Sequence, residues 1–260
     1  MEDGVGHATA IAFARAGASA IAVADLHGVS DDSVAKIKKA ALQAGRAAPF
    51  ILGYKVDIAD RDSVMEMHDE ISRAFNGHLD VVVNSAAHME PDQRIRDSDP
   101  EMYWRTWEVN VRGLLNMIQS FLPLMLSTRE HYSGLCTMIN VSSSGALSAK
   151  PRNGSYRCSK LAGLRWTESL YLDYGNEGLL TFCVNPGAIK TRITKDAPKA
   201  VRDLLPDSPD IAGDTIVWLA SERREWLGGR YVSCPWDMEI LVSMKDDIVQ
   251  GDKLKLTMTL

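Results

Sequence analysis

Short apolar segments alternate with longer segments of helical pattern along most of this chain, and this alternation constrains the fold more than any other feature. Strands are predicted at residues 18–25, 50–56, 79–83, 135–141, 179–184 and 230–233. Helices are predicted from the N-terminus to residue 17 and over residues 30–45, 60–75, 100–125, 153–174 and 209–220. Strands that alternate with helices form parallel sheets, because each connection must cross one face of the sheet. We therefore predict an α/β fold with a doubly wound parallel sheet in three layers.

The chain shows no internal repeat, low-complexity tract or dividing linker over its 260 residues. Residues 1–260 are therefore predicted to form a single domain, with residues 239–260 as a C-terminal tail. The end of this tail alternates lysine or threonine with leucine or methionine, which is a strand-like pattern. We expect a solvated tail there.

Composition excludes several classes of partner. The formal net charge of −5 at pH 7 gives no reason to expect binding to nucleic acid or to an anionic membrane. No apolar run reaches the roughly 20 residues that span a bilayer. The acidic start, Met1-Glu2-Asp3, does not resemble a signal peptide. The four cysteines are widely spaced, as in a reduced cytoplasmic protein, and no metal site is expected.

Tyr156 and Lys160 are separated by one helical turn in the predicted helix at 153–174, so they share a face. An ammonium roughly 4–5 Å from a phenol, at an effective dielectric near 20, favours the phenolate by about 3–4 kcal/mol. This estimate predicts a pKa for Tyr156 about two to three units below the reference value near 10. Ser143 precedes Tyr156 by thirteen residues, and its hydroxyl could face the same substrate oxygen. Ser142 and Ser144 compete with Ser143, and only the spacing separates them.

A glycine pair and a distant aspartate suggest a dinucleotide site. Gly4-Val5-Gly6 opens the first helix, and Asp25 ends the following strand about twenty residues later. Small residues allow a pyrophosphate to approach the positive end of a helix. Asp25 would accept hydrogen bonds from ribose hydroxyls and repel a 2′-phosphate, which favours NAD(H) over NADP(H). The alternative is a solvated carboxylate at a strand end.

The order and spacing of the motifs resemble the short-chain dehydrogenase/reductase family over nearly the whole chain. Positions that match the family pattern are Gly4, Gly6, Asn84 to Ala87, Asn110, Ser143, Tyr156, Lys160, Pro186, Gly187 and Thr191. The resemblance implies a Rossmann-like domain. Residues 226–236 are also similar to reductases of fungal secondary metabolism.

The family resemblance assigns a role to each catalytic position. It implies that Tyr156 is the acid/base at the substrate oxygen and that Lys160 lowers its pKa and holds the nicotinamide ribose. Ser143 would polarise the carbonyl, and Asn110 would position a water that relays protons to Lys160. Hydride would pass directly between the cofactor and the substrate carbon. The resemblance implies cofactor contacts at Gly4, Val5, Gly6, Asp25, Asp57, Ile58, Asn84, Ala86, Tyr156, Lys160, Pro186, Gly187, Ile189 and Thr191.

The sequence departs from the family pattern at its start, where the usual first strand and the first half of the glycine-rich turn are missing. The missing strand would lie between the strands at 18–25 and 79–83, and its absence leaves two unpaired edges. Three explanations compete. The natural N-terminus could be longer, another segment such as the chain's tail or a neighbour's could fill the space, or tight dinucleotide binding could have been lost.

Two functional hypotheses follow. The first is a nicotinamide-dependent dehydrogenase or reductase acting on a carbonyl or secondary alcohol. The second is a non-redox isomerase, dehydratase or cyclase that uses the same Tyr/Lys/Ser pocket with weak dinucleotide binding or none. Residues 188–205 would form a lid over a small molecule. An apolar substrate is suggested by Met89, Ala146, Leu147, Ile193, Ala197 and Val201, although these residues could equally pack internally. The helices at 100–126 and 153–175 form the family's subunit interface, which implies a homodimer or homotetramer.

Overall fold

The predicted strands are all present in the computed structural model, which describes residues 4–194 and 199–258. The strands are β1 (Ala20–Asp25), β2 (Phe50–Lys55), β3 (Val81–Asn84), β4 (Thr137–Val141), β5 (Leu180–Asn185) and β6 (Arg230–Ser233). Every pairing between them is parallel. The strands form two sheets, β1-β2 and β3-β4-β5-β6, rather than one. The α/β class and the doubly wound arrangement are thus confirmed.

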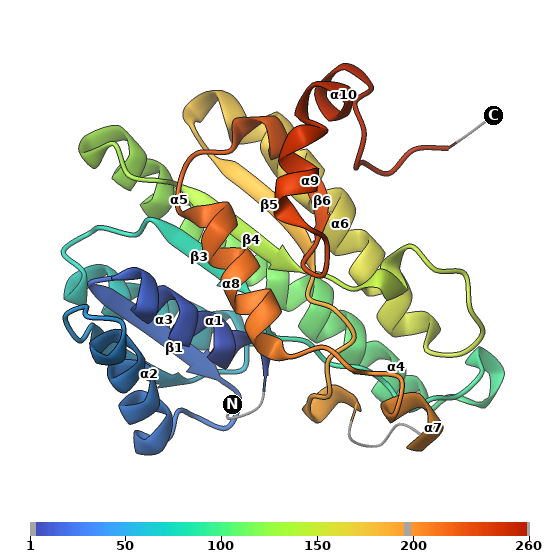
Figure 1. The fold of residues 1–260 in the computed structure, drawn as a ribbon. Helices are drawn as coiled ribbons and strands as arrows, with labels where there is room; N and C mark the ends of the chain where they lie inside the picture. Colours follow the sequence, from blue (N-terminus) through green and yellow to red (C-terminus); the bar gives the residue numbers. More distant parts are fainter. Residues whose placement is uncertain (1–3, 195–198, 259–260) are drawn as a thin grey trace.

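Helices cover both faces of the sheets (Figure 1). One face packs against α1 (Val5–Ala16), α2 (Asp31–Gln43) and α8 (Pro209–Ala220), and the other against α3 (Arg61–Ala74), α5 (Leu114–Tyr132) and α6 (Gly154–Tyr174). The remaining helical segments are α4 (Pro100–Trp107), α7 (Lys199–Arg202), α9 (Met238–Ser243), α10 (Lys245–Gln250), the π-helical turn η2 (Glu108–Gly113), and the 3₁₀ turns η1 (Ile95–Asp97), η3 (Ser144–Ala146), η4 (Gly175–Glu177), η5 (Arg192–Thr194) and η6 (Glu225–Leu227).

Local sequence explains where several of these helices begin. Ser30 accepts a hydrogen bond from the Ser33 amide at the start of α2, and Asp60 accepts one from the Asp62 amide at the start of α3. Helix α1 packs closely on α8, because a Cβ on Gly213 would lie 2.7 Å from the carbonyl oxygen of Ala8. This contact holds the N-terminus of α1 in place beside the sheets.

The space between β1 and β3, here called the strand gap, separates the two sheets. Backbone hydrogen bonds from Phe50 and Val56 to the carbonyls of Ser19 and Asp25 show that the odd-numbered residues of β1 face β2. The amides of Ala20, Ala22 and Ala24 therefore face the gap. On β3, the bond from Thr137 to the Asp80 carbonyl likewise turns the amides of Val81 and Val83 toward the gap. The predicted position of the missing strand is the position of this gap.

The segment predicted as a tail contains the short helices α9 and α10, which the sequence analysis did not anticipate. Helix α9 begins at Asp237, whose carboxylate accepts hydrogen bonds from the amides of Glu239 and Ile240. The following residues run beside β6, where the Tyr231 amide donates to the Leu254 carbonyl at 2.9 Å. The described part of the tail therefore does not fill the strand gap, and Figure 1 shows it at the opposite side of the molecule.

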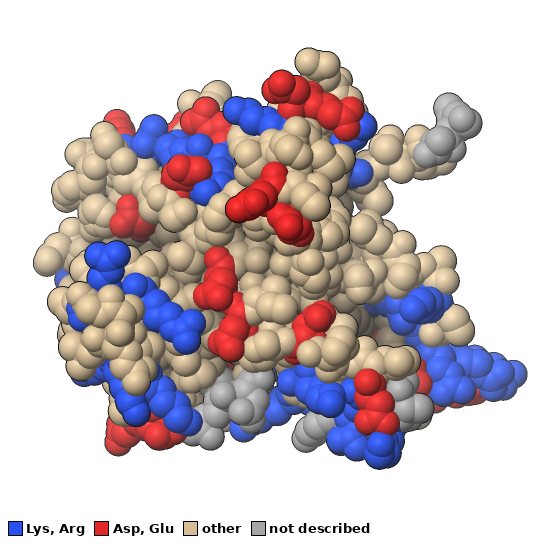
Figure 2. Space-filling view, viewed as in Figure 1, with Lys and Arg blue, Asp and Glu red and all other residues tan. Residues whose placement is uncertain are grey.

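Among the described residues, no helix is both long and apolar enough to cross a bilayer. Acidic and basic side chains are interspersed over the face drawn in Figure 2, so the net charge of −5 is not gathered there into one patch of a single sign.

Candidate active site and dinucleotide cleft

One cavity of about 1470 Å³ brings together the residues that the sequence singled out. It runs along the strand gap to the carboxyl ends of the strands, which is where ligands bind in open parallel sheets. Its walls include all the predicted site residues: Gly4, Val5, Gly6, Asp25, Asp57, Ile58, Asn84, Ala86, Asn110, Ser143, Tyr156, Lys160, Pro186, Gly187, Ile189 and Thr191.

Ser143, Tyr156 and Lys160 meet at the wall of this cavity. Nζ of Lys160 lies 5.8 Å from the centroid of the Tyr156 ring, so the two side chains share the helix face as predicted. The Ser143 hydroxyl lies near enough to the Tyr156 phenol to lower its pKa. The Ser142 hydroxyl donates instead to the Lys160 carbonyl, and Ser144 is held by its backbone amide, which donates to Oδ1 of Asn185. The structure thus selects Ser143 from the three serines.

The predicted direction of the Tyr156 pKa shift is wrong for this structure. Burial raises the pKa of Tyr156 above its ordinary value, and the Ser143 hydroxyl opposes this only in part. Burial also lowers the pKa of Lys160 to about 8. The sequence estimate included the attraction between the two groups but not the desolvation of either. The buried Lys160 ammonium donates to the Val141 carbonyl at 2.8 Å.

The low pKa of Lys160 predicts a specific dependence of stability on pH. Between about pH 8 and the ordinary value of 10.5, the unfolded chain binds a proton at this site that the folded chain has released. Stability should therefore rise with pH in this window. Relative to Lys160→Met, the free energy of unfolding of the wild type should increase by about 2 kcal/mol from pH 8 to pH 9.5. Urea denaturation at both pH values measures this, and a constant difference would contradict the shifted pKa.

Asn110 is fully engaged with the protein. It lies in the π-helical turn η2 between α4 and α5. Its Nδ2 donates to the His88 carbonyl and to the Ser159 hydroxyl, at 2.8 and 2.9 Å, and its Oδ1 accepts from the His88 amide at 2.8 Å. Asn110 therefore ties the loop after β3 to α6. Its predicted role in positioning a water remains a prediction.

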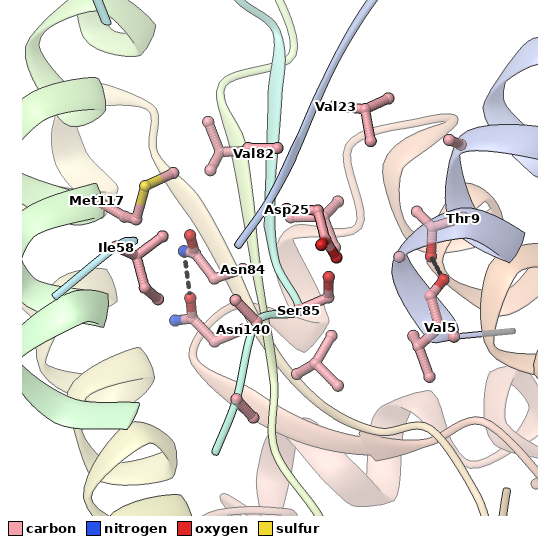
Figure 3. Close-up of a pocket in the computed structure, with 18 of the residues that line it drawn as sticks. Val5, Thr9, Val23, Asp25, Ile58, Val82, Asn84, Ser85, Met117 and Asn140 are labelled. Carbon is pink, nitrogen blue, oxygen red and sulfur yellow. Dashed lines mark hydrogen bonds between the residues drawn. The ribbon is translucent and has the colours of Figure 1, made fainter. Parts of the chain in front are cut away.

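The opposite end of the cavity has features of an anion and ribose site. Within the part of the chain that the structure describes, no side chain caps the N-terminus of α1, and its first turn contains no acidic residue. A Cβ on Gly4 would meet open space, whereas one on Gly6 would lie 2.7 Å from Oγ of Ser85. Oδ1 of Asn84 is buried and has no hydrogen-bond partner among the described residues. Figure 3 shows Asn84, Ser85 and Asp25 directed into the cavity, which Val5 of α1 borders. These residues fit a dinucleotide.

Other predicted residues already have protein partners. Asp57 accepts from the Arg105 guanidinium at 2.5 Å and from the Ala59 amide at 3.0 Å, which leaves it less free to contact an adenine. Gly187 has a φ of 109°, and a Cβ there would lie 2.8 Å from Oδ2 of Asp207, so glycine is needed at this turn.

The residues predicted to contact an apolar substrate are only partly at the cavity wall. Met89 and Ile193 line the cavity, but Ala146 and Leu147 are not among its lining residues. Leu147 is instead 53% exposed. Ala197 lies outside the described residues, and the side chain of Val201 is likewise not described.

The structure also reveals site residues that the sequence analysis did not find. Glu90 and Thr106 are buried beside the start of α6, and His88 contacts both Asn110 and Thr106. No local motif marks these residues, because their partners lie 16 to 66 residues away in the chain. Only tertiary contact identifies them.

Comparison with known proteins gives matches along the chain. The family model described as Enoyl-(Acyl carrier protein) reductase matches residues 1–233. The short chain dehydrogenase citE of Monascus ruber is 38% identical over 257 residues, which cover 99% of this chain and 86% of that protein. The short chain dehydrogenase andI of Emericella variicolor is 32% identical over 255 residues, covering 98% of this chain and 86% of that protein.

Solved structures share the fold. The 3-ketoacyl-(acyl-carrier-protein) reductase from Brucella melitensis complexed with NADH has a TM-score of 0.74 at 23% identity, covering 88% of this chain and 91% of that chain. The gluconate 5-dehydrogenase from Burkholderia cenocepacia in complex with NADP and tartrate has a TM-score of 0.73 at 23% identity, covering 88% of this chain and 89% of that chain. At this level of identity the similarity establishes the fold alone.

Proposed function

The chain belongs to the short-chain dehydrogenase/reductase family, and we propose that it transfers a hydride between a nicotinamide cofactor and a carbonyl or secondary alcohol, with Tyr156 as acid/base. The resemblance inferred from the motifs, including that to fungal reductases, is thereby confirmed at the level of family. The observation that carries the finer proposal is the meeting of Ser143, Tyr156 and the buried Lys160 at the wall of the cavity.

The proposed role of Ser143, Tyr156 and Lys160 is to transfer a proton to or from the substrate oxygen. In the reducing direction, the Tyr156 phenol would donate its proton to the substrate oxygen, and the Ser143 hydroxyl would donate a hydrogen bond to the same oxygen. Burial raises the pKa of Tyr156, which keeps the phenol in its protonated, donating form. The Lys160 ammonium lies close enough to stabilise the phenolate that remains after the transfer.

A nicotinamide dinucleotide bound in the cavity would supply or accept the hydride. We infer that the uncapped amides of α1 hold its phosphates and that the Asp25 carboxylate accepts from a ribose hydroxyl. The unpartnered Oδ1 of Asn84 is a further acceptor facing the same space. Lys160 and Asn110 are buried at this end of the cavity.

Asp25 is proposed to set the preference for NAD(H). Its Oδ1 accepts from the His27 amide at 2.8 Å, so the carboxylate is held at the end of β1. Asp25→Asn keeps this turn and removes the negative charge that would repel a 2′-phosphate. We expect NADPH to bind about tenfold more tightly to the variant than to the wild type. Calorimetric titration measures this, with the exposed Asp31→Asn as control. An unchanged NADPH affinity would contradict the role of Asp25.

The reaction class is tested directly by turnover. Purified protein is mixed with NADH or NADPH and a panel of small, largely apolar ketones, and absorbance at 340 nm is followed. We expect oxidation of the cofactor that depends on the ketone. The alternative, a non-redox isomerase, dehydratase or cyclase, is favoured by one observation: the strand gap lies on the cofactor side of the cavity only. No binding of either cofactor at millimolar concentration would favour that alternative.

Self-association is inferred from the apolar residues on α4, α5 and α6. Trp104, Leu115 and Leu172 are exposed on these helices. Exposed aromatic and aliphatic side chains of this kind are typical of subunit interfaces. We propose that these helices pair in a homodimer or homotetramer.

A further inference from the structure

The helix that carries Tyr156 lacks a local cap. Asn153 precedes α6 with φ 48° and ψ 43°, in the left-handed region, and its side chain accepts no hydrogen bond from the first turn. Other helices are capped by their own neighbours, as α2 is by Ser30 and α9 by Asp237. An uncapped N-terminus leaves backbone N–H groups unsatisfied, and this one is buried, with Ser155 at 0% exposure.

The carboxylate of Glu90 satisfies these groups from a distant part of the chain. Its Oε1 accepts from the Ser155 amide at 3.0 Å, and its Oε2 accepts from the Tyr156 amide at 3.0 Å. The side chain of Asn153 turns back and donates to the Glu90 carbonyl at 3.1 Å. Glu90 is only 3% exposed. A buried carboxylate thus caps α6 at Tyr156 itself.

Glu90 also connects the start of α6 to the other elements of the site. The buried Thr106 hydroxyl on α4 lies 3.3 Å from Oε2 of Glu90 and 3.0 Å from Nδ1 of His88. The backbone of His88 makes two hydrogen bonds with Asn110, which in turn donates to Ser159 of α6. A continuous set of hydrogen bonds therefore links the loop after β3, the α4–η2 segment and α6.

No ion pair to Glu90 is found within residues 4–194 and 199–258. Its charge is instead matched by two backbone amides and by the positive end of α6. Buried carboxylates are stabilised by hydrogen bonds of this charge-assisted kind. Because the acceptor contacts the backbone of Tyr156, any displacement of Glu90 displaces the tyrosine.

We propose that Glu90 is a positioning residue for the reaction: it caps α6 at Tyr156 and directs the phenol toward Ser143 and the cavity. The inference rests on the proposed function of Tyr156 as acid/base. It adds a residue outside the Ser-Tyr-Lys cluster, and it predicts two separable effects of the side chain. One effect is geometric, through the amides, and the other is electrostatic, through the negative charge.

The electrostatic effect has a definite sign. Glu90 raises the pKa of Tyr156, because a nearby negative charge disfavours the phenolate. The other groups that face this region are His88 on the loop, Tyr103 and Arg105 on α4, and Arg157, Cys158 and Lys160 on α6. These groups are the same in the wild type and in a Glu90 variant, so the difference between the two proteins reports on Glu90. Removing the charge of Glu90 should therefore lower the pKa of Tyr156, and reductase activity should begin to fall at a lower pH.

Two variants separate geometry from charge. Glu90→Gln keeps the length of the side chain and removes the charge, while Glu90→Asp keeps the charge and shortens the reach. We expect Glu90→Gln to lower kcat about tenfold with little change in the KM for NADH, because a hydrogen bond to a charged acceptor is lost. The alkaline limb of the pH–activity profile of this variant should move to lower pH. Glu90→Asp should lower kcat but keep the wild-type alkaline limb. Asp237→Asn, which removes a capping charge from α9, is the matched control. It should change neither kcat nor the alkaline limb.

Amide hydrogen exchange tests the cap without any assay of activity. The Ser155 and Tyr156 amides should exchange faster in Glu90→Gln than in the wild type, whereas amides near the C-terminus of α6 should not. The proposal is overturned if Glu90→Gln retains the wild-type kcat and alkaline limb, or if its exchange rates are unchanged. If the wild type turned over no ketone with either cofactor, the proposed function would fail. Faster exchange in Glu90→Gln would then still support the cap.

Discussion

Replacing Tyr156 by phenylalanine is expected to lower kcat by about 10²–10⁴-fold, the range typical for loss of a general acid. The substitution removes only the hydroxyl that Ser143 contacts, and the ring remains buried in the same environment. NADH affinity should therefore change little. The decisive measurement is turnover at saturating ketone, together with the dissociation constant of NADH for both proteins.

Tyr171→Phe is the matched control for this experiment. Tyr171 lies on the same helix, and its hydroxyl makes a long hydrogen bond of 3.4 Å to the Glu225 carbonyl. It is absent from the cavity wall. Its removal should leave kcat within about twofold of the wild type. A Tyr156→Phe variant that keeps more than a tenth of the activity would exclude the phenol as proton donor. Loss of activity supports the pocket under either enzymatic hypothesis and does not by itself establish the cofactor.

Amide exchange on β3 is expected to alternate by about three orders of magnitude between neighbouring residues. The backbone amide of Val82 faces β4 and belongs to the regular ladder, whereas the amides of Val81 and Val83 face the strand gap. Amides that are paired in a buried ladder exchange only through rare opening, and amides that face an open cavity exchange readily. Exchange measured by NMR should therefore be fast at Val81 and Val83 and slow at Val82.

The same measurement reports on the strand gap as a whole. Ala20, Ala22 and Ala24 on the facing edge of β1 should exchange as fast as Val81 and Val83. Val184 of β5, a strand that pairs with both β4 and β6, provides a protected reference. Uniform protection along β1 and β3 would show that both edges have a hydrogen-bonding partner, and the open gap would then be wrong.

Much of the fold could be predicted from the chain because its signals are local. The continuous apolar run ending at Val83 and the capping residues Ser30 and Asp60 each act within a few residues. It is also predictable that Asp25, Asn84 and Ser143 line the same cavity. In a parallel sheet, the strand ends that carry Asp25, Asn84 and Ser143 must lie at one edge.

Three features could not be predicted in this way. The pKa shift of Tyr156 depends on how deeply the folded chain buries the phenol, and burial is its largest cause. The engagement of Asp57 with Arg105 joins residues 48 positions apart. The helices α9 and α10 occupy residues expected to be solvated, because Leu241 and Ile248 pack against the core formed by β4, β5 and β6.

By itself, the sequence determined the order of the six strands and of the main helices between them, the family, and the face that Tyr156 and Lys160 share, because each of these depends on residues close together in the chain. The tertiary structure alone decided which serine meets the phenol, in which direction the phenol's pKa moves, and that Glu90 caps the helix from 65 residues away. Desolvation and long-range hydrogen bonds exist only once distant segments are packed together, so no local pattern encodes them.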